Sequence, residues 1–376
     1  MRAFKYFASH LPKRRLPQVN RLLFNSLLLL LALWLMLSGC AETKYVMRFD
    51  PEQRAGGTTA TWPAAPETPR YGYVGELVGE QNFVPEAGDT RSKGMKVLAW
   101  LVGLFDSNED RTVLKRPQSG TVDAEGRIYV TDVSNHAVFV FDQAAGKLLV
   151  WNRAMPNKRF VTPIGIAMGA GGQILVADAE LGAVFRLDRE GQPIGSFGQG
   201  VLTRPTGLAR DAQRGRIYVS DTHAHDVKVF DDEGVLLETI GHRGEGGGEL
   251  NFPTHLAFAD DKLYVTDGMN ARVQIYDTQG QVSGTLGQRG LFIGNFTRPK
   301  GVTVDPAGNI YVVESFYDSL LVFNSEGNFL MPLGGTGKEV GQFYLPSGVW
   351  SDPRGRIYVA DMFNGRIAIF QLLGGT

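Results

Sequence analysis

Histidines are the residues of this sequence whose type and spacing best suit metal chemistry. His223 and His225 share one short segment, DTHAHD, in which Asp226 follows directly, and His255 lies thirty residues further on. Neutral imidazole and carboxylate are common ligands of divalent metals, so one hypothesis is that these four side chains bind a metal. The alternative is that they and His136 lie in solvent-facing turns, with one or two lining a pocket. The sequence favours this alternative, because two of the histidines share a single turn.

Arginines form a second pattern. Arg116, Arg204 and Arg298 each stand directly before a proline. If all three point into a common opening, they form a positive ring suited to an anion; otherwise they pair with neighbouring acids or loop carbonyls. The sequence contains no serine nucleophile elbow and no Cys-x-x-Cys pair. We therefore assign no catalytic residue.

The chain positions these residues through a unit that recurs six times between residue 114 and the end. Each unit opens with a proline, at intervals of 46, 42, 48, 46 and 47 residues. About fifteen residues after the proline an apolar run ends in an acid, and a second apolar run follows. The opening prolines are Pro117, Pro163, Pro205, Pro253, Pro299 and Pro346. The closing acids are Asp132, Asp178, Asp221, Asp267, Glu314 and Asp361.

Both apolar runs of each unit are typical of β-strands. Residues 217–219 and 227–230, for example, are rich in β-branched and aromatic side chains and too short for helices. Periods of about 40 to 50 residues that contain several short strands indicate the blades of a β-propeller. The six acids are expected to accept hydrogen bonds from turn amides, so we interpret them as structural residues and not as catalytic ones.

The repeated unit resembles the NHL repeat, as in residues 298–302 (RPKGV), followed by NIYVVE and SLLVF. The resemblance covers residues 114–376 and implies an all-β fold: a six-bladed β-propeller with four-stranded blades. The last unit has only three strands, so we expect residues 71–78 (YGYVGELV) to supply the fourth strand and close the ring. The propeller is thus predicted over residues 70–376. A short helix is predicted at about 93–105, where apolar residues recur near helical spacing.

Residues that differ between blades are the candidates for ligand binding, because loops on a rigid frame commonly carry recognition. The residue after each proline and the turn after each acid are expected on one face, around the central opening. Peptide-amidating lyases, which resemble this fold, have zinc-binding histidines directly after these prolines, and here none of the six residues is a histidine. The calcium ligands of gluconolactonase-like propellers cannot be aligned either. The candidate ligand-binding residues are Gln118, His136, Arg204, His223, His225, Thr254, His255, Met269, Asn270, Lys300, Phe316, Tyr317 and Phe363.

These observations favour a binding scaffold for a protein or polymer ligand, without a cofactor. The alternative is a metal-dependent enzyme of the lyase or lactonase kind, acting on a small molecule over the central channel. Such an enzyme requires a deep polar pocket in which three metal ligands converge.

The N-terminal residues 1–39 resemble a bacterial lipoprotein signal peptide. A basic lead precedes an apolar stretch at residues 27–37, and the sequence LSGC that ends at Cys40 resembles the lipobox. In lipoproteins the chain is cut before this cysteine, so Cys40, the only cysteine, is expected to carry the lipid. An uncleaved transmembrane helix is the alternative, but the sixteen residues 22–37 fall short of the roughly twenty that a span needs.

The composition of the mature chain limits its partners. Residues 40–69 are poor in apolar residues and contain a Gly-Gly pair and several prolines, so they are predicted to be a flexible tether. The residue after Cys40 is Ala41, whereas an aspartate at this position would resemble an inner-membrane retention signal. The alanine therefore favours attachment to the outer membrane, facing the periplasm. Residues 40–376 contain 32 Lys and Arg and 39 Asp and Glu, a net charge of −7. Nucleic acid requires a positive surface, so the expected partners are the membrane and an envelope protein or polysaccharide.

Overall fold

The computed structural model describes Ser26 and residues 44–49, 60–86 and 111–374, and almost all of these lie in strands and turns. The signal peptide, Cys40 and the helix predicted at 93–105 fall outside the described residues, apart from Ser26. No helix in the described part of the chain is long and apolar enough to cross a membrane. Its short 3-10 helices are η1 (Glu80–Asn82), η2 (Ala170–Gly172) and η3 (Gly268–Asn270).

The strands form six antiparallel sheets, which we name blades 1 to 6. Blade 1 contains β5 (Pro117–Val122), β6 (Ile128–Asp132), β7 (Ala137–Asp142) and β8 (Lys147–Trp151). Blade 2 contains β11 (Pro163–Met168), β12 (Ile174–Asp178), β13 (Ala183–Leu187) and β14 (Pro193–Phe197). Blade 3 contains β15 (Pro205–Asp211), β16 (Arg216–Asp221), β17 (Asp226–Asp231) and β18 (Leu236–Ile240).

The second half of the ring repeats this arrangement. Blade 4 contains β19 (Pro253–Ala259), β20 (Lys262–Asp267), β21 (Arg272–Tyr276) and β22 (Val282–Leu286). Blade 5 contains β23 (Pro299–Val304), β24 (Ile310–Glu314), β25 (Ser319–Phe323) and β26 (Phe329–Gly334). Blade 6 contains β27 (Val349–Ser351), β28 (Arg356–Asp361), β29 (Arg366–Leu372), β3 (Tyr71–Leu77) and, at its outer edge, the short β2 (Thr61–Trp62).

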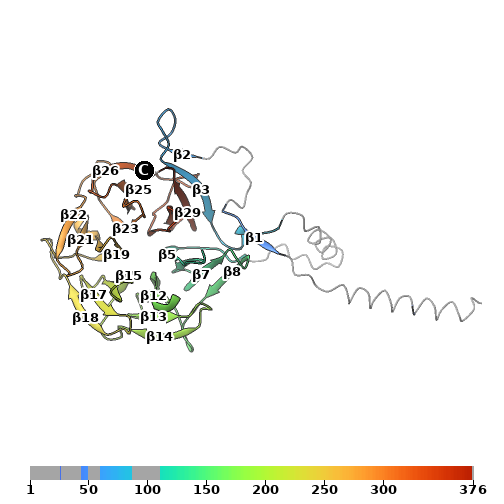
Figure 1. The fold of residues 1–376 in the computed structure, drawn as a ribbon, viewed down its shortest axis with the longest axis horizontal. Coiled ribbons are helices and arrows are strands. Elements are labelled where there is room, and N and C mark those ends of the chain that lie inside the picture. Colours follow the sequence, from blue (N-terminus) through green and yellow to red (C-terminus); the bar gives the residue numbers. More distant parts are fainter. Residues whose placement is uncertain (1–25, 27–43, 50–59, 87–110, 375–376) are drawn as a thin grey trace, which may run out of the picture. The chain divides into compact units, whose positions relative to one another are not determined.

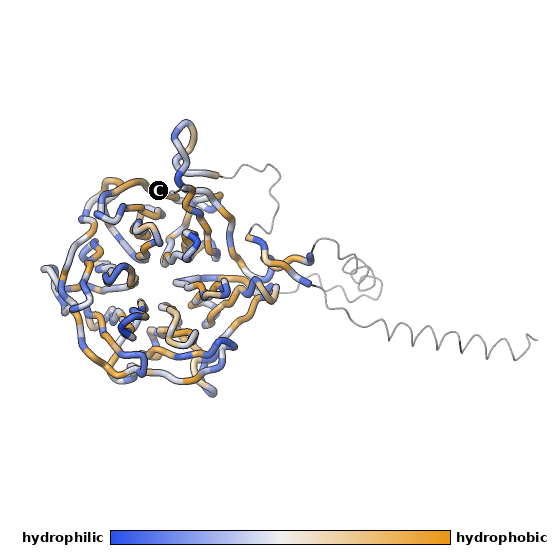
Figure 2. Tube along the Cα trace, in the orientation of Figure 1, coloured by the Kyte–Doolittle hydropathy of each residue, from blue (hydrophilic) through white to orange (hydrophobic). Residues whose placement is uncertain are grey.

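The blades surround a central axis, with the first strand of each unit innermost (Figure 1). Each inner strand lies beside the inner strand of the next blade, and β27 of blade 6 lies beside β5 of blade 1. Hydrophobic residues recur along the strands of every blade (Figure 2), because each sheet is covered by a neighbour on both faces. The predicted ring of six four-stranded blades is confirmed.

The ring closes through β3, as predicted from the sequence. This strand pairs antiparallel with β29, in a register that places Leu77 opposite Ile367. The Arg366 side chain joins the two strands, since its Nη1 lies 2.8 Å from Glu76 Oε2 and its Nε lies 2.8 Å from Asp361 Oδ2. The upstream strand therefore takes the outer place in blade 6 that the C-terminal residues leave open.

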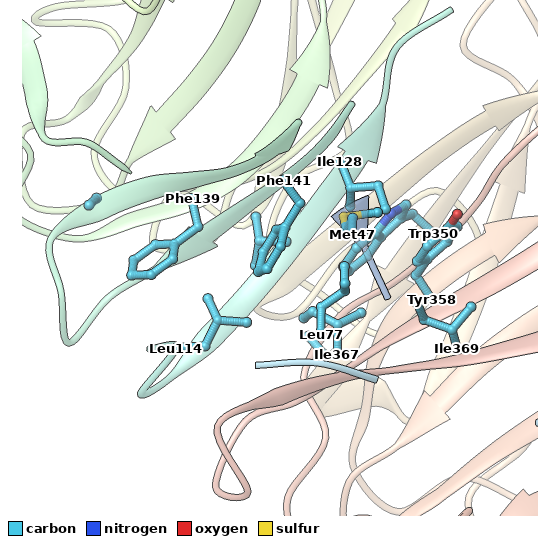
Figure 3. Packing of buried hydrophobic residues seen from close by; sticks show 13 residues of the cluster. Met47, Leu77, Leu114, Ile128, Phe139, Phe141, Trp350, Tyr358, Ile367 and Ile369 are labelled. Atoms are coloured by element: carbon cyan, nitrogen blue, oxygen red, sulfur yellow. The ribbon is translucent and has the colours of Figure 1, made fainter. Parts of the chain in front are cut away.

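A hydrophobic cluster fills the junction between the first and last blades. Figure 3 shows Phe141 and Ile128 of blade 1 near Trp350 and Ile367 of blade 6, with Leu77 next to Ile367. Leu77 is fully buried, so the closing strand contributes to the core as well as to the ladder. Burying such a side chain stabilises the fold by roughly 1.5 to 3 kcal/mol.

The tether predicted at residues 40–69 requires a correction. Within that range, β1 (Tyr45–Met47) pairs with β4 (Phe83–Pro85), and Met47 is buried in the junction cluster. Further along, β2 pairs with β3, and the Trp62 ring meets the Phe370 ring edge-on at 5.4 Å between centroids. The segment is poor in apolar residues overall, but Met47 and Trp62 pack against the ring, which the composition alone does not indicate.

The acid at the end of each second strand holds the chain that leads into the inner strand. Asp132, for example, accepts hydrogen bonds from the backbone N–H groups of Lys115 (2.6 Å), Arg116 (2.9 Å), Ser134 (3.0 Å) and Asn135 (2.9 Å). The corresponding acids of the other blades are equally buried and also accept backbone N–H groups: Asp178, Asp221, Asp267, Glu314 and Asp361. These contacts fix the proline and the residue after it at the rim of the channel.

Candidate functional site

The residues that follow the six prolines line one cavity at the mouth of the central channel. Its volume is about 210 Å³. Five of the six prolines pair in register with the blade acids, as Pro299 does with Glu314, so this mouth lies on the face that carries the turns after the acids. We call this cavity the mouth pocket. Its lining residues are Gln118, Ile164, Thr206, Thr254, His255, Arg298, Lys300, Ser315, Leu345, Pro346, Ser347 and Met362.

Three hydroxyl groups in this lining have structural partners in the next blade. Thr206 Oγ1 donates to the Thr254 carbonyl at 3.1 Å, and Thr254 Oγ1 donates to the Lys300 carbonyl at 3.1 Å. Ser347 Oγ reaches the Gln118 carbonyl at 3.2 Å across the closure of the ring. These bonds join neighbouring inner strands, so the Thr254 hydroxyl, a candidate for ligand binding, has its proton engaged within the ring.

Lys300 and Arg298 bring positive charge to the mouth pocket. Neither side chain has a carboxylate partner among the described residues. Burial lowers the pKa of the Lys300 ammonium, and the guanidinium of Arg298 lowers this pKa further. The Arg298 backbone N–H is held by both oxygens of Glu314, at 2.9 Å each, so this carboxylate is engaged by the backbone.

His255 lies beneath these cations. The residue is 8% exposed, and its ring nitrogens make no well-aligned hydrogen bond within the described residues, although the backbones of Gln118 and Lys300 lie close to the ring. Burial lowers its pKa to about 4, and the charge of Lys300 acts in the same direction; the nearby backbones of Gln118 and Lys300 oppose them more weakly. The imidazole is therefore neutral at neutral pH and carries one donor and one acceptor nitrogen.

His255 also lines a second cavity, of about 280 Å³, which runs along the inner strands. The indole of Trp350 contributes to this lining, and its N–H has no partner among the described residues. Arg210 lines it too, but its guanidinium is engaged with Asp232 through bonds of 2.8 and 2.6 Å. His255 thus stands where the mouth pocket meets the channel.

The three arginines before the prolines do not form a ring around the mouth. Only Arg298 lines the pocket. Arg204 lies 3.8 Å from the Glu180 carboxylate, and the Arg116 guanidinium covers the Phe363 ring at 5.0 Å from its centroid. Two of the three arginines therefore have local partners, as the second alternative from the sequence described.

Two of the four residues of the metal hypothesis are engaged with other groups. His225 Nδ1 accepts the Phe252 backbone N–H at 3.2 Å, and Asp226 is engaged with Lys228. No three His, Cys, Asp or Glu side chains in the part of the chain that the structure describes are placed to hold a metal ion. The four side chains of the hypothesis therefore do not form a cluster of three or more ligands in this arrangement.

The remaining candidates lie outside the pocket. His223 is exposed, with its ring 6.1 Å from Phe252. His136 Nδ1 contacts the Val161 carbonyl. The Asn270 amide donates to the Gly244 carbonyl and to Asp267 Oδ2, both at 2.8 Å, and so fixes the turn after that acid.

Six exposed apolar side chains lie in turns of blades 4 to 6 or in the loop between blades 4 and 5, on the face that carries the mouth pocket. The Tyr317 hydroxyl donates to the Leu291 carbonyl at 3.2 Å, and Arg289 donates to the Met269 carbonyl, so three successive turns touch. Phe292 is 82% exposed, and the sequence did not predict it or its two neighbours; their signal is the apolar triplet between two glycines. We call this surface the apolar rim and define it as Met269, Leu291, Phe292, Ile293, Phe316 and Phe363.

Comparison with known proteins supports the fold. A family model described as a 6-bladed beta-propeller matches residues 250–331, and the NHL repeat model matches residues 114–141 and 202–230. No curated protein matches the chain.

Similar solved structures include proteins of different activities. Virginiamycin B lyase from Staphylococcus aureus is 14% identical, with 69% of this chain and 96% of that chain covered, at a TM-score of 0.51. A gluconolactonase from Xanthomonas campestris is 18% identical, with 70% of this chain and 90% of that chain covered, at a TM-score of 0.52. An auxiliary nutrient binding protein from Bacteroides ovatus is 14% identical, with 69% of this chain and 70% of that chain covered, at a TM-score of 0.54. At these identities the likeness concerns the fold alone. The chain carries NHL repeats on a six-bladed β-propeller.

Proposed function

We propose that this protein is a binding scaffold of the cell envelope, which engages a protein partner through the apolar rim. The observation that carries this proposal is that large apolar side chains, more than a third exposed, stand in turns that contact one another through Tyr317 and Leu291 and through Arg289 and Met269. Aromatic residues and methionine are enriched at protein interfaces, and contiguous exposed apolar surface marks an interaction site.

Hydrogen bonds and ring contacts hold the aromatic side chains of the apolar rim in place, which favours a role in binding. Phe316 follows Glu314, whose carboxylate accepts the Phe316 backbone N–H at 3.0 Å, and its ring meets Tyr317 edge-on at 5.0 Å. Phe363 is flanked by Tyr344, with 5.5 Å between ring centroids, and by the guanidinium of Arg116. Preorganised aromatic anchors of this kind lower the entropy lost on binding.

The proposal includes attachment to the outer membrane through a lipid on Cys40, on the periplasmic side. It rests on the LSGC sequence after an apolar stretch and on the alanine that follows the cysteine. Metabolic labelling with a radioactive fatty acid tests it. We expect a labelled wild type and an unlabelled Cys40→Ser variant, and an unlabelled wild type contradicts the attachment.

Crosslinking in intact envelopes, followed by purification and mass spectrometry, tests the rim. The test variant is Phe292→Ser with Phe316→Ser, and the control is Leu237→Ser on the outer strand β18. Leu237 is 50% exposed and Phe316 is 52% exposed, so the control matches one of the two changes in exposed fraction, at a position outside the apolar rim.

The double variant is expected to lose at least one partner that the wild type and the Leu237→Ser variant both retain. Truncating a buried aromatic anchor weakens an interface by about 2 kcal/mol or more, a loss of about thirtyfold in affinity. An unchanged set of crosslinked proteins in the double variant contradicts the assignment of the rim, as does an equal loss in the control.

A further inference from the structure

The mouth pocket has a chemistry that the apolar rim does not use. Its lining includes two cationic side chains, Lys300 and Arg298, and no aspartate or glutamate. The mature chain as a whole carries net charge −7, so this concentration of positive charge runs against the average of the molecule. A positively charged cavity in a negatively charged protein attracts anionic ligands to that one place.

We propose that the mouth pocket is an oxyanion-binding site, in which Lys300 and Arg298 hold a carboxylate or phosphate group of a small ligand above His255. This inference goes beyond the proposed function, because it concerns the interior of the channel mouth and not the surface of the rim.

The first support is the state of Lys300. Lys300 is half-buried, has no carboxylate partner among the described residues, and stands near the exposed Arg298, whose charge lowers the pKa of the Lys300 ammonium. An uncompensated charge in such a place destabilises a fold. An oxyanion removes this unfavourable arrangement and forms charge-assisted hydrogen bonds of the strong kind.

The second support is His255, which is more than nine-tenths buried and whose ring nitrogens make no well-aligned hydrogen bond within the described residues, with only the backbones of Gln118 and Lys300 close to the ring. A buried polar group without a partner is uncommon in a folded protein and calls for a ligand or water. Because His255 lines both the mouth pocket and the channel below it, a group held by the two cations lies within the reach of its ring. In its neutral form the imidazole donates one hydrogen bond to an oxyanion.

The size of the mouth pocket limits what enters it. Its volume of about 210 Å³ lies below the range of about 300 to 1,000 Å³ typical of sites for whole drug-sized ligands. Met362 and Leu345 add apolar surface to one side of the lining. The pocket therefore suits one charged group on a compact body, such as a sugar acid or a sugar phosphate.

Isothermal titration of the full chain tests the site, with D-glucuronate and inorganic phosphate as probes and D-glucose as the neutral control. The test variant is Lys300→Met, which removes the charge and keeps the length of the side chain. The matched variant is Lys262→Met at the start of β20, which changes the net charge equally at an exposed position.

We expect the wild type and the Lys262→Met variant to bind at least one of the two anions. The affinity of Lys300→Met for that anion is expected to be lower by about tenfold or more. Binding of glucuronate alone identifies a carboxylate ligand, and binding of phosphate alone identifies a phosphorylated one. Failure of both anions to bind, equal binding of glucose, or equal affinity in Lys300→Met and Lys262→Met overturns the proposal.

A second measurement guards against misfolding of the variant. Because Lys300→Met replaces a half-buried charge that has no carboxylate partner among the described residues by an apolar side chain, its urea midpoint in anion-free buffer is expected to equal or exceed that of the wild type. A lower midpoint contradicts the description of Lys300 as uncompensated. The rim variants leave the mouth pocket untouched, so the outcome of the crosslinking experiment is independent of this one.

Discussion

Replacing Arg366 with methionine tests the closure of the ring by the upstream strand. The guanidinium is 7% exposed and contacts two carboxylates at 2.8 Å each, one on β28 (Asp361) and one on β3 (Glu76). It also donates to the carbonyls of Glu339 and Gln342, at 3.2 and 2.9 Å. One side chain therefore joins the closing strand, the second strand of blade 6 and the loop between blades 5 and 6.

The expected loss follows from what Arg366→Met leaves behind. Removing one partner of a buried ion pair costs about 3 to 5 kcal/mol, because the other charge stays buried without compensation. Asp361 is fully buried, whereas Glu76 keeps 20% of its side chain exposed and regains some hydration. We therefore expect a loss of about 3 kcal/mol, a large fraction of the roughly 5 to 15 kcal/mol typical of folded domains.

Urea unfolding followed by tryptophan fluorescence measures this loss, with Arg189→Met as the control. Arg189 pairs with Glu125 at 3.1 Å, but the two side chains are 54% and 52% exposed, so its removal is expected to cost about 0 to 1 kcal/mol. A loss for Arg366→Met below about 1 kcal/mol, or one equal to that of the control, refutes the role of this contact in closure.

The stability of the Arg366→Met variant relative to the wild type is expected to change with pH in one direction. Burial raises the pKa of Asp361, while the Tyr344 amide and the Arg366 side chain oppose this effect. A carboxyl group with a raised pKa in the folded state contributes most stability below its unfolded pKa and loses that contribution as the pH rises. Removing Arg366 raises the pKa of Asp361 further. The deficit of the variant is therefore expected to shrink as the pH falls from 7 toward about 4.

Three further substitutions probe the packing of the ring by urea unfolding. Gly207→Ala places a Cβ 2.3 Å from the Thr254 carbonyl of the next blade, and about 1 to 3 kcal/mol of stability is expected to be lost; an unchanged midpoint contradicts this close approach. Met47→Ala is expected to lose about 2 kcal/mol or more if β1 packs on the junction cluster, whereas a free tether loses nothing. Asp178→Ala leaves the amides of Val161 and Thr162 without their acceptor, and a loss of less than about 1 kcal/mol contradicts its structural role.

The ring was predictable from the sequence because its signals repeat. A proline, an apolar run and an acid in register six times over determine the strands, and the missing fourth strand of the last unit pointed to residues 71–78. The strand β1 was not predictable in this way. Its pairing with β4 depends on a place for Met47 that exists only after blades 1 and 6 have met.

The candidate site was predictable only as a place. The post-proline positions identified the mouth pocket, since Gln118 and Lys300 line it as expected for that face. The sequence does not reveal that the Thr254 hydroxyl is engaged by the next blade, or that Arg204 turns outward to Glu180. Such choices depend on distances between blades, which the repeat itself does not encode.

The separation of Glu76 and Arg366 by 290 residues has a consequence for biogenesis. At synthesis rates of about 5 to 20 residues per second, β3 emerges roughly 15 to 60 seconds before its partner β29 is complete. During that interval its edge is an unpaired template for other extended segments. A chaperone that keeps this early segment apart until the C-terminus arrives therefore protects the assembly of the whole ring.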